Sequence, residues 1–437
     1  MGAFNMSNYS KMMERTKWFR EDRFGMFIHW GLYTIPARGE WIRCTERMSL
    51  EKYDEYFNEF NPTKYDPKEW ARLAKEAGMK YAVMTAKHHD GFCLFDSKYT
   101  DYKSTNTKAK RDLIREYVDA FRAEGLKVGI YYSLIDWHHE DYPHYGDMYH
   151  PMRDNEAYKD MKHDFKNYLK YMHSQIEELV TNYGKIDLMW FDFSYGDMVG
   201  EKWEATKIVE LVRKHQPGIL IDNRMGSAGN NMMAGGIRAE EPSIYAGDFA
   251  SPEKIIPIEP IKNKAGNKIP WEACVTMNDN WGYSSKDKNF KSPETLVKTL
   301  VNCVSKDGNL LLNIGPNSKG EIPKESVEIL ENIGRWMSDN GDSIYGCGSS
   351  CYEKPQWGRY TQKGNKLYAH ILEEPIGPVY FEGMKDSIAK ARLLKDGSEL
   401  KVETPWNAEE YQDHGFITLP SHAFKTNYPV VVELTMK

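Results

Sequence analysis

The sequence predicts an α/β fold, with a (β/α)8 TIM-like barrel over residues 1–345 followed by a small C-terminal antiparallel β-sandwich over residues 346–437. Through most of the chain, short apolar runs rich in β-forming residues alternate with amphipathic stretches, which is typical of repeated βα units. The apolar runs are nearly continuous, as expected for parallel strands covered on both faces. No Gly-x-Gly-x-x-Gly motif follows the first run, so a barrel fits better than a dinucleotide-binding fold.

The barrel elements can be placed in order along the chain. The strand candidates are 25–30, 81–86, 127–132, 186–191, 218–222 and 310–314, and the helix candidates are 66–78, 110–124, 156–182, 201–215 and 292–305. The 66–78 helix has Pro67 in its first turn and Gly78 at its end, and these residues favour a helix start and a helix stop. We expect the two remaining barrel strands between residues 234 and 275, where the pattern is obscure.

After Tyr345 the pattern changes from helical periodicity to short β-like runs. Runs at 366–372, 389–394 and 430–435 are separated by turn sequences such as Lys-Asp-Gly-Ser at 395–398. This spacing predicts the antiparallel sandwich. No low-complexity linker separates it from the barrel, so we expect the two domains to pack directly together.

Composition excludes several classes of partner. The chain has 58 Lys+Arg against 64 Asp+Glu, a net charge of −6, which provides no basic surface for a nucleic acid or an anionic membrane. Its longest apolar runs fall far short of the roughly 20 residues that a bilayer requires. The N-terminal residues show no basic segment followed by an apolar stretch, so we expect a cytoplasmic protein. The oligomeric state stays open, with a homo-oligomer as one alternative.

The cysteines and histidines do not form a metal-binding pattern. The six Cys include no Cys-x-x-Cys pair, and Cys347 and Cys351 are expected to be reduced in a chain without an export signal. The pairs His88-His89 and His138-His139 lack the i, i+4 helical spacing of a zinc protease, and neighbouring residues on a strand point to opposite faces. We therefore expect no metal and no cofactor.

Polar and aromatic residues follow the ends of five consecutive predicted strands. Active sites of (β/α)8 barrels form at this carboxyl-terminal edge, so these side chains should meet in one site. The residues at the strand ends are His29, Trp30, His88, His89, Tyr131, Tyr132, Trp190, Asp192, Asp222 and Arg224.

The types of residue at this edge suit a carbohydrate. The set has a carboxylate, histidines and indole rings but no nucleophile elbow and no phosphate-binding glycine loop. A retaining glycosidase needs one carboxylate as nucleophile and a second carboxyl group as acid and base. Asp192, which ends a buried strand beside Trp190, is the candidate nucleophile.

Several motifs, in order along nearly the whole chain, resemble glycoside hydrolase family 29, the α-L-fucosidases. They are Arg-Phe-Gly-Met-Phe-Ile-His-Trp-Gly at 23–31, Gly-Glu-Trp at 39–41, Lys-His-His-Asp-Gly-Phe at 87–92, Gly-Ile-Tyr-Tyr-Ser at 129–133, Trp-Phe-Asp at 190–192, Trp-Glu at 271–272, Trp-Gly-Tyr at 281–283 and Gly-Asp-Ser-Ile-Tyr-Gly at 341–346. The resemblance implies a catalytic barrel with a β-sandwich and metal-independent, retaining hydrolysis of terminal α-L-fucose through a covalent fucosyl-enzyme.

The resemblance also implies roles for individual residues. It makes Asp192 the nucleophile, and it prefers Tyr131 to Tyr132 because the first tyrosine matches the motif better. The implied substrate-binding residues are the pocket donors His29, Glu40, His88, His89, Tyr131 and Arg224 and the aromatic walls Trp41, Trp190 and Trp281.

The resemblance leaves the acid/base open, because family members do not keep it at one position. Glu253 resembles a loop glutamate that serves this role in the broad-specificity branch of the family, and Glu272 after Trp271 is the alternative. Asp248 and Glu241 are weaker options.

Three other functions remain as alternatives. One is a fucose-binding protein without turnover, a second is a metal-dependent barrel hydrolase that uses His88 and His89, and a third is a relaxed α-L-galactosidase. The sequence does not indicate the linkage cleaved, which would depend on loops around the pocket mouth such as 194–200 and 223–244.

Overall fold

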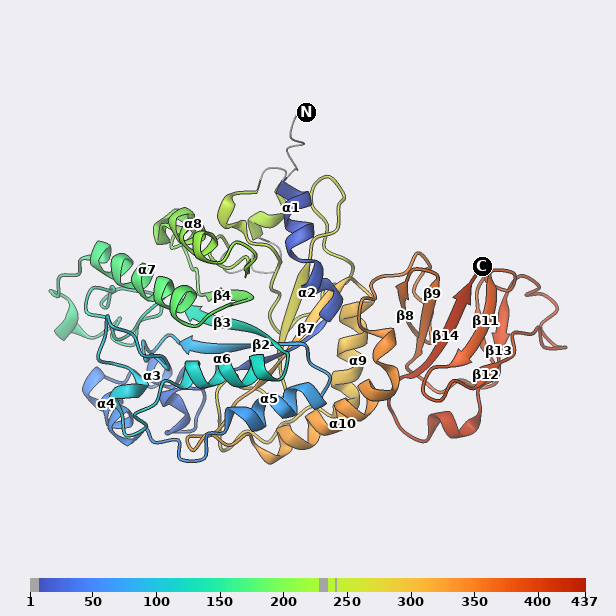
Figure 1. Cartoon of the computed structure of the whole chain (residues 1–437), viewed down its shortest axis with the longest axis horizontal. Helices are drawn as coiled ribbons and strands as arrows, with labels where there is room; N and C mark the ends of the chain where they lie inside the picture. The colour runs from blue at the N-terminus through green and yellow to red at the C-terminus, as the bar shows by residue number, and fades with distance from the viewer. Residues whose placement is uncertain (1–7, 228–234, 240–241) are drawn as a thin grey trace.

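The computed structural model describes residues 8–227, 235–239 and 242–437. In this part of the chain, seven parallel strands form one curled sheet in the order β5-β4-β3-β2-β1-β7-β6 (Figure 1). Their bounds are β1 Phe24–Ile28, β2 Tyr81–Lys87, β3 Lys127–Ser133, β4 Leu188–Asp192, β5 Leu220–Ile221, β6 Trp271–Thr276 and β7 Gly308–Ile314. The sheet and its helices confirm the predicted α/β barrel class.

Helices cover the outside of the sheet, and neighbouring helices pack on one another, α5 with α6, α7 with α8, and α10 with both α5 and α9. Together with the N-terminal α1 Asn8–Arg15 and α2 Lys17–Asp22, they are α3 Ile42–Thr45, α4 Leu50–Glu59, α5 Pro67–Glu76, α6 Leu113–Ala123, α7 Phe165–Asn182, α8 Ala205–His215, α9 Pro293–Val304 and α10 Lys324–Asn340. Among the described residues, no helix is long and apolar enough to cross a membrane.

Two helices begin later than the sequence predicts. Helix α7 begins at Phe165 rather than at 156, because the Asp164 side chain accepts a hydrogen bond from Lys166 N and caps the helix there. Helix α8 begins at Ala205 rather than at 201, because Glu204 has a left-handed backbone with φ 53°. Such a residue interrupts a right-handed helix.

An irregular segment, residues 248–254, fills the gap between the two edge strands of the barrel. Asp248 N donates to Ile221 O of β5 at 2.7 Å, and on the other side Glu272 N of β6 donates to Ala250 O at 2.9 Å. Isolated parallel bridges pair Asp222 with Phe249 and Glu253 with Cys274. This segment therefore occupies the place of the eighth strand, and β6 is the other strand that the sequence left obscure.

The interior of the barrel is filled mainly by large aromatic side chains. Its cluster includes Phe27, Tyr131 and Trp190, which stack with ring centroids 5.1–6.0 Å apart. Side chains of this size close the centre of a parallel barrel, so the open space lies above them at the carboxyl ends of the strands.

The C-terminal part forms two antiparallel sheets, of order β12-β11-β14-β9-β8 and β10-β13. Trp336 Nε1 of α10 donates to Pro429 O at 3.0 Å, and Thr361 Oγ1 of β8 donates to Ser343 O at 2.7 Å, so this part packs directly on the barrel (Figure 1). The division at residue 345 stays a prediction. The strands are β8 Gly358–Lys363, β9 Lys366–Ile371, β10 Val379–Phe381, β11 Ile388–Leu393, β12 Glu399–Leu400, β13 Gly415–Ile417 and β14 Val430–Met436.

Candidate active site

A pocket of about 290 Å³ opens at the carboxyl ends of the barrel strands. Of the twelve residues given a catalytic or substrate-binding role from the sequence, eleven line this pocket and Glu272 does not. The eleven are His29, Glu40, Trp41, His88, His89, Tyr131, Trp190, Asp192, Arg224, Glu253 and Trp281. The other strand-end residues, Trp30, Tyr132 and Asp222, do not line it either.

Asp192 ends β4 and points into the pocket between two hydrogen-bond donors. Tyr131 Oη donates to Asp192 Oδ2 at 2.8 Å, and Arg224 Nη1 donates to Asp192 Oδ1 at 2.9 Å. The neighbouring Tyr132 points the other way and donates to Gln175 at 2.7 Å, because successive strand residues face opposite sides of the sheet. Both carboxylate oxygens are thus fixed, which aims the group at the pocket.

Arg224 joins the two candidate catalytic carboxylates. Its Nη1 lies 2.9 Å from Asp192 Oδ1 and 2.9 Å from Glu253 Oε2. Ser251 holds Nε and Nη2, each at 3.1 Å, and the guanidinium carbon lies 4.3 Å from the ring centroid of Trp190. Burial alone would lower the pKa of Arg224, but the two carboxylates outweigh it and raise the pKa above its ordinary value, so the side chain is positively charged.

Glu253 lies at the mouth of the pocket. Its Oε1 accepts a hydrogen bond from Trp281 Nε1 at 3.2 Å, and its Oε2 binds Arg224. The Glu253 side chain is 31% exposed, whereas that of Asp192 is 12% exposed. A carboxyl group in this position can reach both a departing group and solvent.

Glu272 lies one layer deeper in the barrel. It precedes Cys274, which lines the pocket, by two residues, so both face inward and Glu272 lies below. Tyr81 Oη and Trp190 Nε1 donate to its carboxyl oxygens, and the residue is fully buried. Burial raises the pKa of Glu272 to about 7. That value would suit an acid, but the carboxyl group does not reach the pocket.

The two weaker acid/base options also lie elsewhere. Asp248 is buried between Arg15 and Arg213, with Oδ1 to Arg15 Nη2 at 2.6 Å and Oδ2 to Arg213 Nη2 at 3.0 Å, and it does not line the pocket. Glu241 lies outside the described residues.

Three buried histidines face the pocket in their neutral form. Burial lowers the pKa of His29 to about 3 and holds the pKa values of His88 and His89 well below the ordinary value. His89 Nδ1 lies 2.7 Å from Ser133 Oγ, which donates its own proton to Ile135 O, so Nδ1 is the protonated nitrogen of His89. The Nε2 lone pair, 4.0 Å from Asp192 Oδ2, is then free to accept a hydrogen bond from a hydroxyl group.

The hydrogen-bond partner of His29 likewise determines which of its ring nitrogens carries the proton. Its Nδ1 lies 2.7 Å from Asn313 Oδ1, while Asn313 Nδ2 donates to Trp281 O at 2.8 Å. The amide orientation therefore makes His29 Nδ1 the donor and Nε2 the acceptor. Histidines prepared in this way select hydroxyl donors rather than anions.

Glu40 and the tryptophans complete the walls of the pocket. Glu40 Oε2 accepts a hydrogen bond from Gly282 N at 2.7 Å, and burial raises the pKa of this carboxyl group. Trp41 packs edge-on against His89 at 5.1 Å, and Trp281 packs on His29 at 5.1 Å. These flat apolar surfaces beside hydrogen-bonding groups suit the faces of a sugar ring.

The pocket also contains residues that sequence reasoning missed. Phe193, directly after Asp192, has φ 81°, and its ring packs against Trp41, His89 and Tyr149. Phe193 could have been predicted from the sequence because it directly follows the candidate nucleophile. Tyr149 could not, because it comes from a long loop that carries no motif. The missed lining residues are Phe27, Tyr149, Phe193 and Cys274, whereas Ser194, Tyr195 and Gly196 come from the loop 194–200 that was expected at the pocket mouth.

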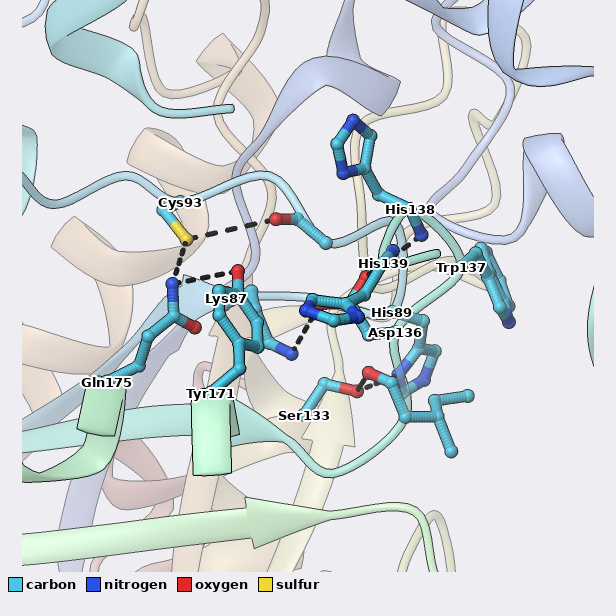
Figure 2. Close-up of polar contacts among 12 residues, drawn as sticks. Lys87, His89, Cys93, Ser133, Asp136, Trp137, His138, His139, Tyr171 and Gln175 are labelled. Atoms are coloured by element: carbon cyan, nitrogen blue, oxygen red, sulfur yellow. Dashed lines mark hydrogen bonds and ion pairs between the residues drawn. The ribbon is translucent and has the colours of Figure 1, made fainter. Parts of the chain in front are cut away.

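A buried ion pair holds the two histidines that follow β2 (Figure 2). Lys87 Nζ donates to Asp136 Oδ2 at 2.9 Å with both side chains buried, and Asp136 Oδ1 accepts from the backbone of His138 and His139. Trp137 N donates to His89 O at 2.8 Å. The pair thus joins the end of β2 to the loop after β3 and fixes His89 against Asp192.

The histidine clusters form no metal site in the described part of the chain. There, no three His, Cys, Asp or Glu side chains are grouped as a metal would require. Figure 2 shows the ring of His138 on the other side of the Lys87–Asp136 pair from Ser133.

The class of protein follows from this chemistry: the chain is a glycoside hydrolase built on a barrel, with two carboxyl groups delivered to a pocket of the size of a sugar. The family model of alpha-L-fucosidases matches residues 3–342. The chain belongs to the α-L-fucosidase family.

Individual relatives agree with this membership. The α-L-fucosidase isoenzyme 1 of Paenibacillus thiaminolyticus shares 60% identity and a TM-score of 0.94, with 98% of this chain and 99% of that chain covered. Human tissue α-L-fucosidase is 29% identical, over 92% of this chain and 84% of its own. A GH29 α-L-fucosidase of Bacteroides thetaiotaomicron, solved as a trapped covalent intermediate with 2-fluoro-fucosyl fluoride, is 28% identical with a TM-score of 0.80, covering 100% of this chain and 98% of its own.

Substitution of Glu272 by Gln should change how stability depends on pH. The raised pKa means that the folded state keeps a proton that the unfolded state loses as pH rises from about 4.5 to about 7, so stability falls over this range. Relative to wild type, Glu272→Gln should therefore gain about 3 kcal/mol in free energy of unfolding between pH 4.5 and pH 8.

Urea unfolding at several pH values measures this difference. The matched control is Glu210→Gln on the exposed side of α8, which should track wild type at every pH. If the free energies of unfolding of Glu272→Gln and wild type change in parallel from pH 4.5 to 8, Glu272 does not keep a proton in the folded state over this range.

Proposed function

We propose that this chain is a retaining exo-α-L-fucosidase that removes terminal α-L-fucose from fucosylated oligosaccharides or glycoconjugates by double displacement. The observation that carries the proposal is the guanidinium of Arg224 between Asp192 and Glu253. Two contacts of 2.9 Å that meet on one nitrogen keep the nearest carboxylate oxygens within about 5.8 Å of each other. Retaining glycosidases hold their carboxyl groups about 5–5.5 Å apart, and inverting enzymes hold them about 6.5–9.5 Å apart.

The pocket supports an exo mode of action. Its volume of about 290 Å³ leaves room for one sugar ring, and its floor is closed by the aromatic interior of the barrel, with Trp190 and Tyr131 on the pocket side. A chain of sugars cannot run through such a site. A terminal residue enters with its anomeric carbon near Asp192 and its glycosidic oxygen toward Glu253 at the mouth.

In the first step the Asp192 carboxylate attacks the anomeric carbon as the bond to the glycosidic oxygen breaks. Glu253 gives its proton to that oxygen, so the leaving group departs as an alcohol and the sugar is held as an ester of Asp192. Arg224 and the Tyr131 hydroxyl hold the Asp192 oxygens before attack, and Arg224 stabilises the negative charge that remains on Glu253.

In the second step water takes the place of the leaving group. The Glu253 carboxylate removes a proton from the water, the water oxygen bonds to the anomeric carbon, and Asp192 leaves as a carboxylate. The product keeps the configuration of the substrate because the carbon is inverted twice. The covalent intermediate trapped in the Bacteroides relative supports this route.

The neutral histidines support recognition of an uncharged sugar. The Nε2 atoms of His29 and His89 accept hydrogen bonds from ring hydroxyls, and Trp41 and Trp281 present apolar surface to the C6 methyl group and the ring. An α-L-galactoside differs by one hydroxyl at C6, so it is the closest competing substrate. A pocket that merely bound fucose would need no carboxyl group at its mouth.

The direct test uses the wild-type protein with α-L-fucosides and other aryl glycosides. We expect hydrolysis of the α-L-fucoside, with α-L-fucose as the first product in an NMR time course. A first product of β configuration would contradict the retaining mechanism, and binding without any hydrolysis would support a fucose-binding protein instead.

Replacing Asp192 by Ala should lower kcat on an aryl α-L-fucoside by about 10³-fold or more, because no covalent ester can form. The smaller side chain leaves room for azide to attack directly, so added azide should restore turnover and give β-L-fucosyl azide. Unchanged turnover in Asp192→Ala, or rescue that gives the α azide, would remove Asp192 from the role of nucleophile.

Replacing Glu253 by Ala should give an azide product of the opposite anomeric configuration to that formed by Asp192→Ala. Without the acid, kcat/KM on fucosides with poor leaving groups should fall about 10²–10⁴-fold, with a smaller loss on activated ones. Azide then attacks the fucosyl-enzyme and gives α-L-fucosyl azide. Glu272→Gln is the matched control and should keep activity on both kinds of substrate. If Glu272→Gln shows the leaving-group dependence and Glu253→Ala does not, the two assignments are reversed.

A further inference from the structure

A second cavity, of about 510 Å³, lies at the same edge of the barrel as the catalytic pocket. Its walls come from the loop after β6, the loop after β7 and the first turn of α10. Trp281 lines both cavities. The two spaces are therefore neighbours that share one wall.

The lining of this cavity combines aromatic rings with free polar groups. Trp281, Tyr283 and Phe290 are each partly exposed there. The side chains of Asn278, Tyr283 and Ser284 make no hydrogen bond to any other residue that the structure describes. An amide, a phenol and a hydroxyl beside half-exposed rings are the groups that bind sugars.

The walls are held in place by the protein itself. Lys291 Nζ donates to Thr276 O at 2.8 Å and to Asn278 O at 3.0 Å, and Asp287 Oδ2 accepts from Asn280 Nδ2 at 2.7 Å. Asn313 binds Trp281 O at 2.8 Å. Because these hydrogen bonds already fix the wall residues, the wall residues lose little conformational entropy when a ligand enters.

Most charges around the cavity are paired. Lys288 lies 3.2 Å from Glu325, Lys324 lies 3.5 Å from Glu328, and Glu321 lies 2.8 Å from Lys64. Within the described part of the chain, Asp287 has no ion pair and accepts hydrogen bonds from Asn280 Nδ2 and from backbone N–H groups. The described lining therefore offers no unpaired cation to a sulfated or sialylated ligand and suits an uncharged one.

Trp281 connects this cavity to the reaction. Its indole N–H binds Glu253 Oε1 at 3.2 Å, and under the proposed function Glu253 protonates the oxygen that leaves the fucose. The leaving group therefore departs along Trp281, toward the side on which the second cavity opens. At about 510 Å³, the cavity is larger than the pocket of about 290 Å³ that takes one sugar.

We propose that this cavity binds the leaving-group part of the substrate, a neutral oligosaccharide whose first sugar rests against Trp281 and whose hydroxyls bind Asn278, Tyr283 and Ser284. The inference rests on the proposed function and deepens it, because it makes the enzyme selective for fucosylated oligosaccharides over simple fucosides. Asn278 and Tyr283 are then specificity-determining residues that do not touch the fucose.

The test compares a substrate that reaches the cavity with one that does not. Fucosyl fluoride has no sugar in its leaving group, whereas a panel of neutral fucosylated oligosaccharides of different linkage fills the cavity. In the double variant Asn278→Ala/Tyr283→Phe, kcat/KM on the best oligosaccharide should fall about 30-fold, because two hydrogen bonds of about 1 kcal/mol each are lost. On fucosyl fluoride it should stay within about twofold of wild type.

A second readout is binding without turnover. The same oligosaccharide without its fucose should inhibit wild type, and its inhibition constant should rise about 30-fold in the double variant. Tyr411→Phe, on the exposed surface of the C-terminal part, is the matched control and should behave like wild type on every substrate.

The outcomes separate this inference from the function on which it rests. If wild type does not hydrolyse fucosyl fluoride, the proposed function fails. If wild type hydrolyses fucosyl fluoride but the double variant loses nothing on the oligosaccharides, or loses equally on both substrates, only the cavity proposal is overturned. It is also overturned if wild type prefers none of the oligosaccharides to methyl α-L-fucoside, which has an alcohol leaving group of similar reactivity but no sugar to enter the cavity.

Discussion

The pocket depends on one guanidinium placed between two carboxylates. Without it, the negative charges of Asp192 and Glu253 would repel each other across the pocket. Arg224 compensates both charges at 2.9 Å and is held in turn by Ser251 and by the face of Trp190. The position of this one side chain sets the separation of the carboxyl groups, and the separation decides the stereochemical course.

The neutral histidines make the same arrangement selective. If His29, His88 and His89 were protonated, their positive charges would compete with Arg224 for the carboxylates. Their burial lowers the three pKa values, so no histidine cation competes with Arg224 for the carboxylates. Lys87 and Asp136 hold the turn that carries His88 and His89, in a buried pair that neutralises itself. The pocket therefore recognises hydroxyl groups through the orientation of its hydrogen-bonding atoms rather than through charge.

Much of this site could be predicted from the sequence, because parallel strands deliver the residues at their carboxyl ends to one edge. His29, Tyr131 and Asp192 all end regular strands, and their apolar runs mark those ends clearly. Tyr149 could not be found, because a long loop brings it over the pocket and nothing local encodes that approach. The different depths of Glu253 and Glu272 could not be predicted either, since only the register of β6 shows that Glu272 lies one layer below the pocket lining.

The irregular closure of the barrel explains how Glu253 reaches the mouth of the pocket. On a regular strand an inward carboxyl group lies in the interior, as Glu272 does, with both oxygens taken by Tyr81 and Trp190. The segment 248–254 pairs with its neighbours at few points, and Lys254 leaves it with a left-handed φ of 53°. The chain turns away directly after Glu253, which keeps that side chain 31% exposed. Under the proposed function Glu253 must also accept a proton from water, which requires access to solvent, and the irregular segment 248–254 provides that access.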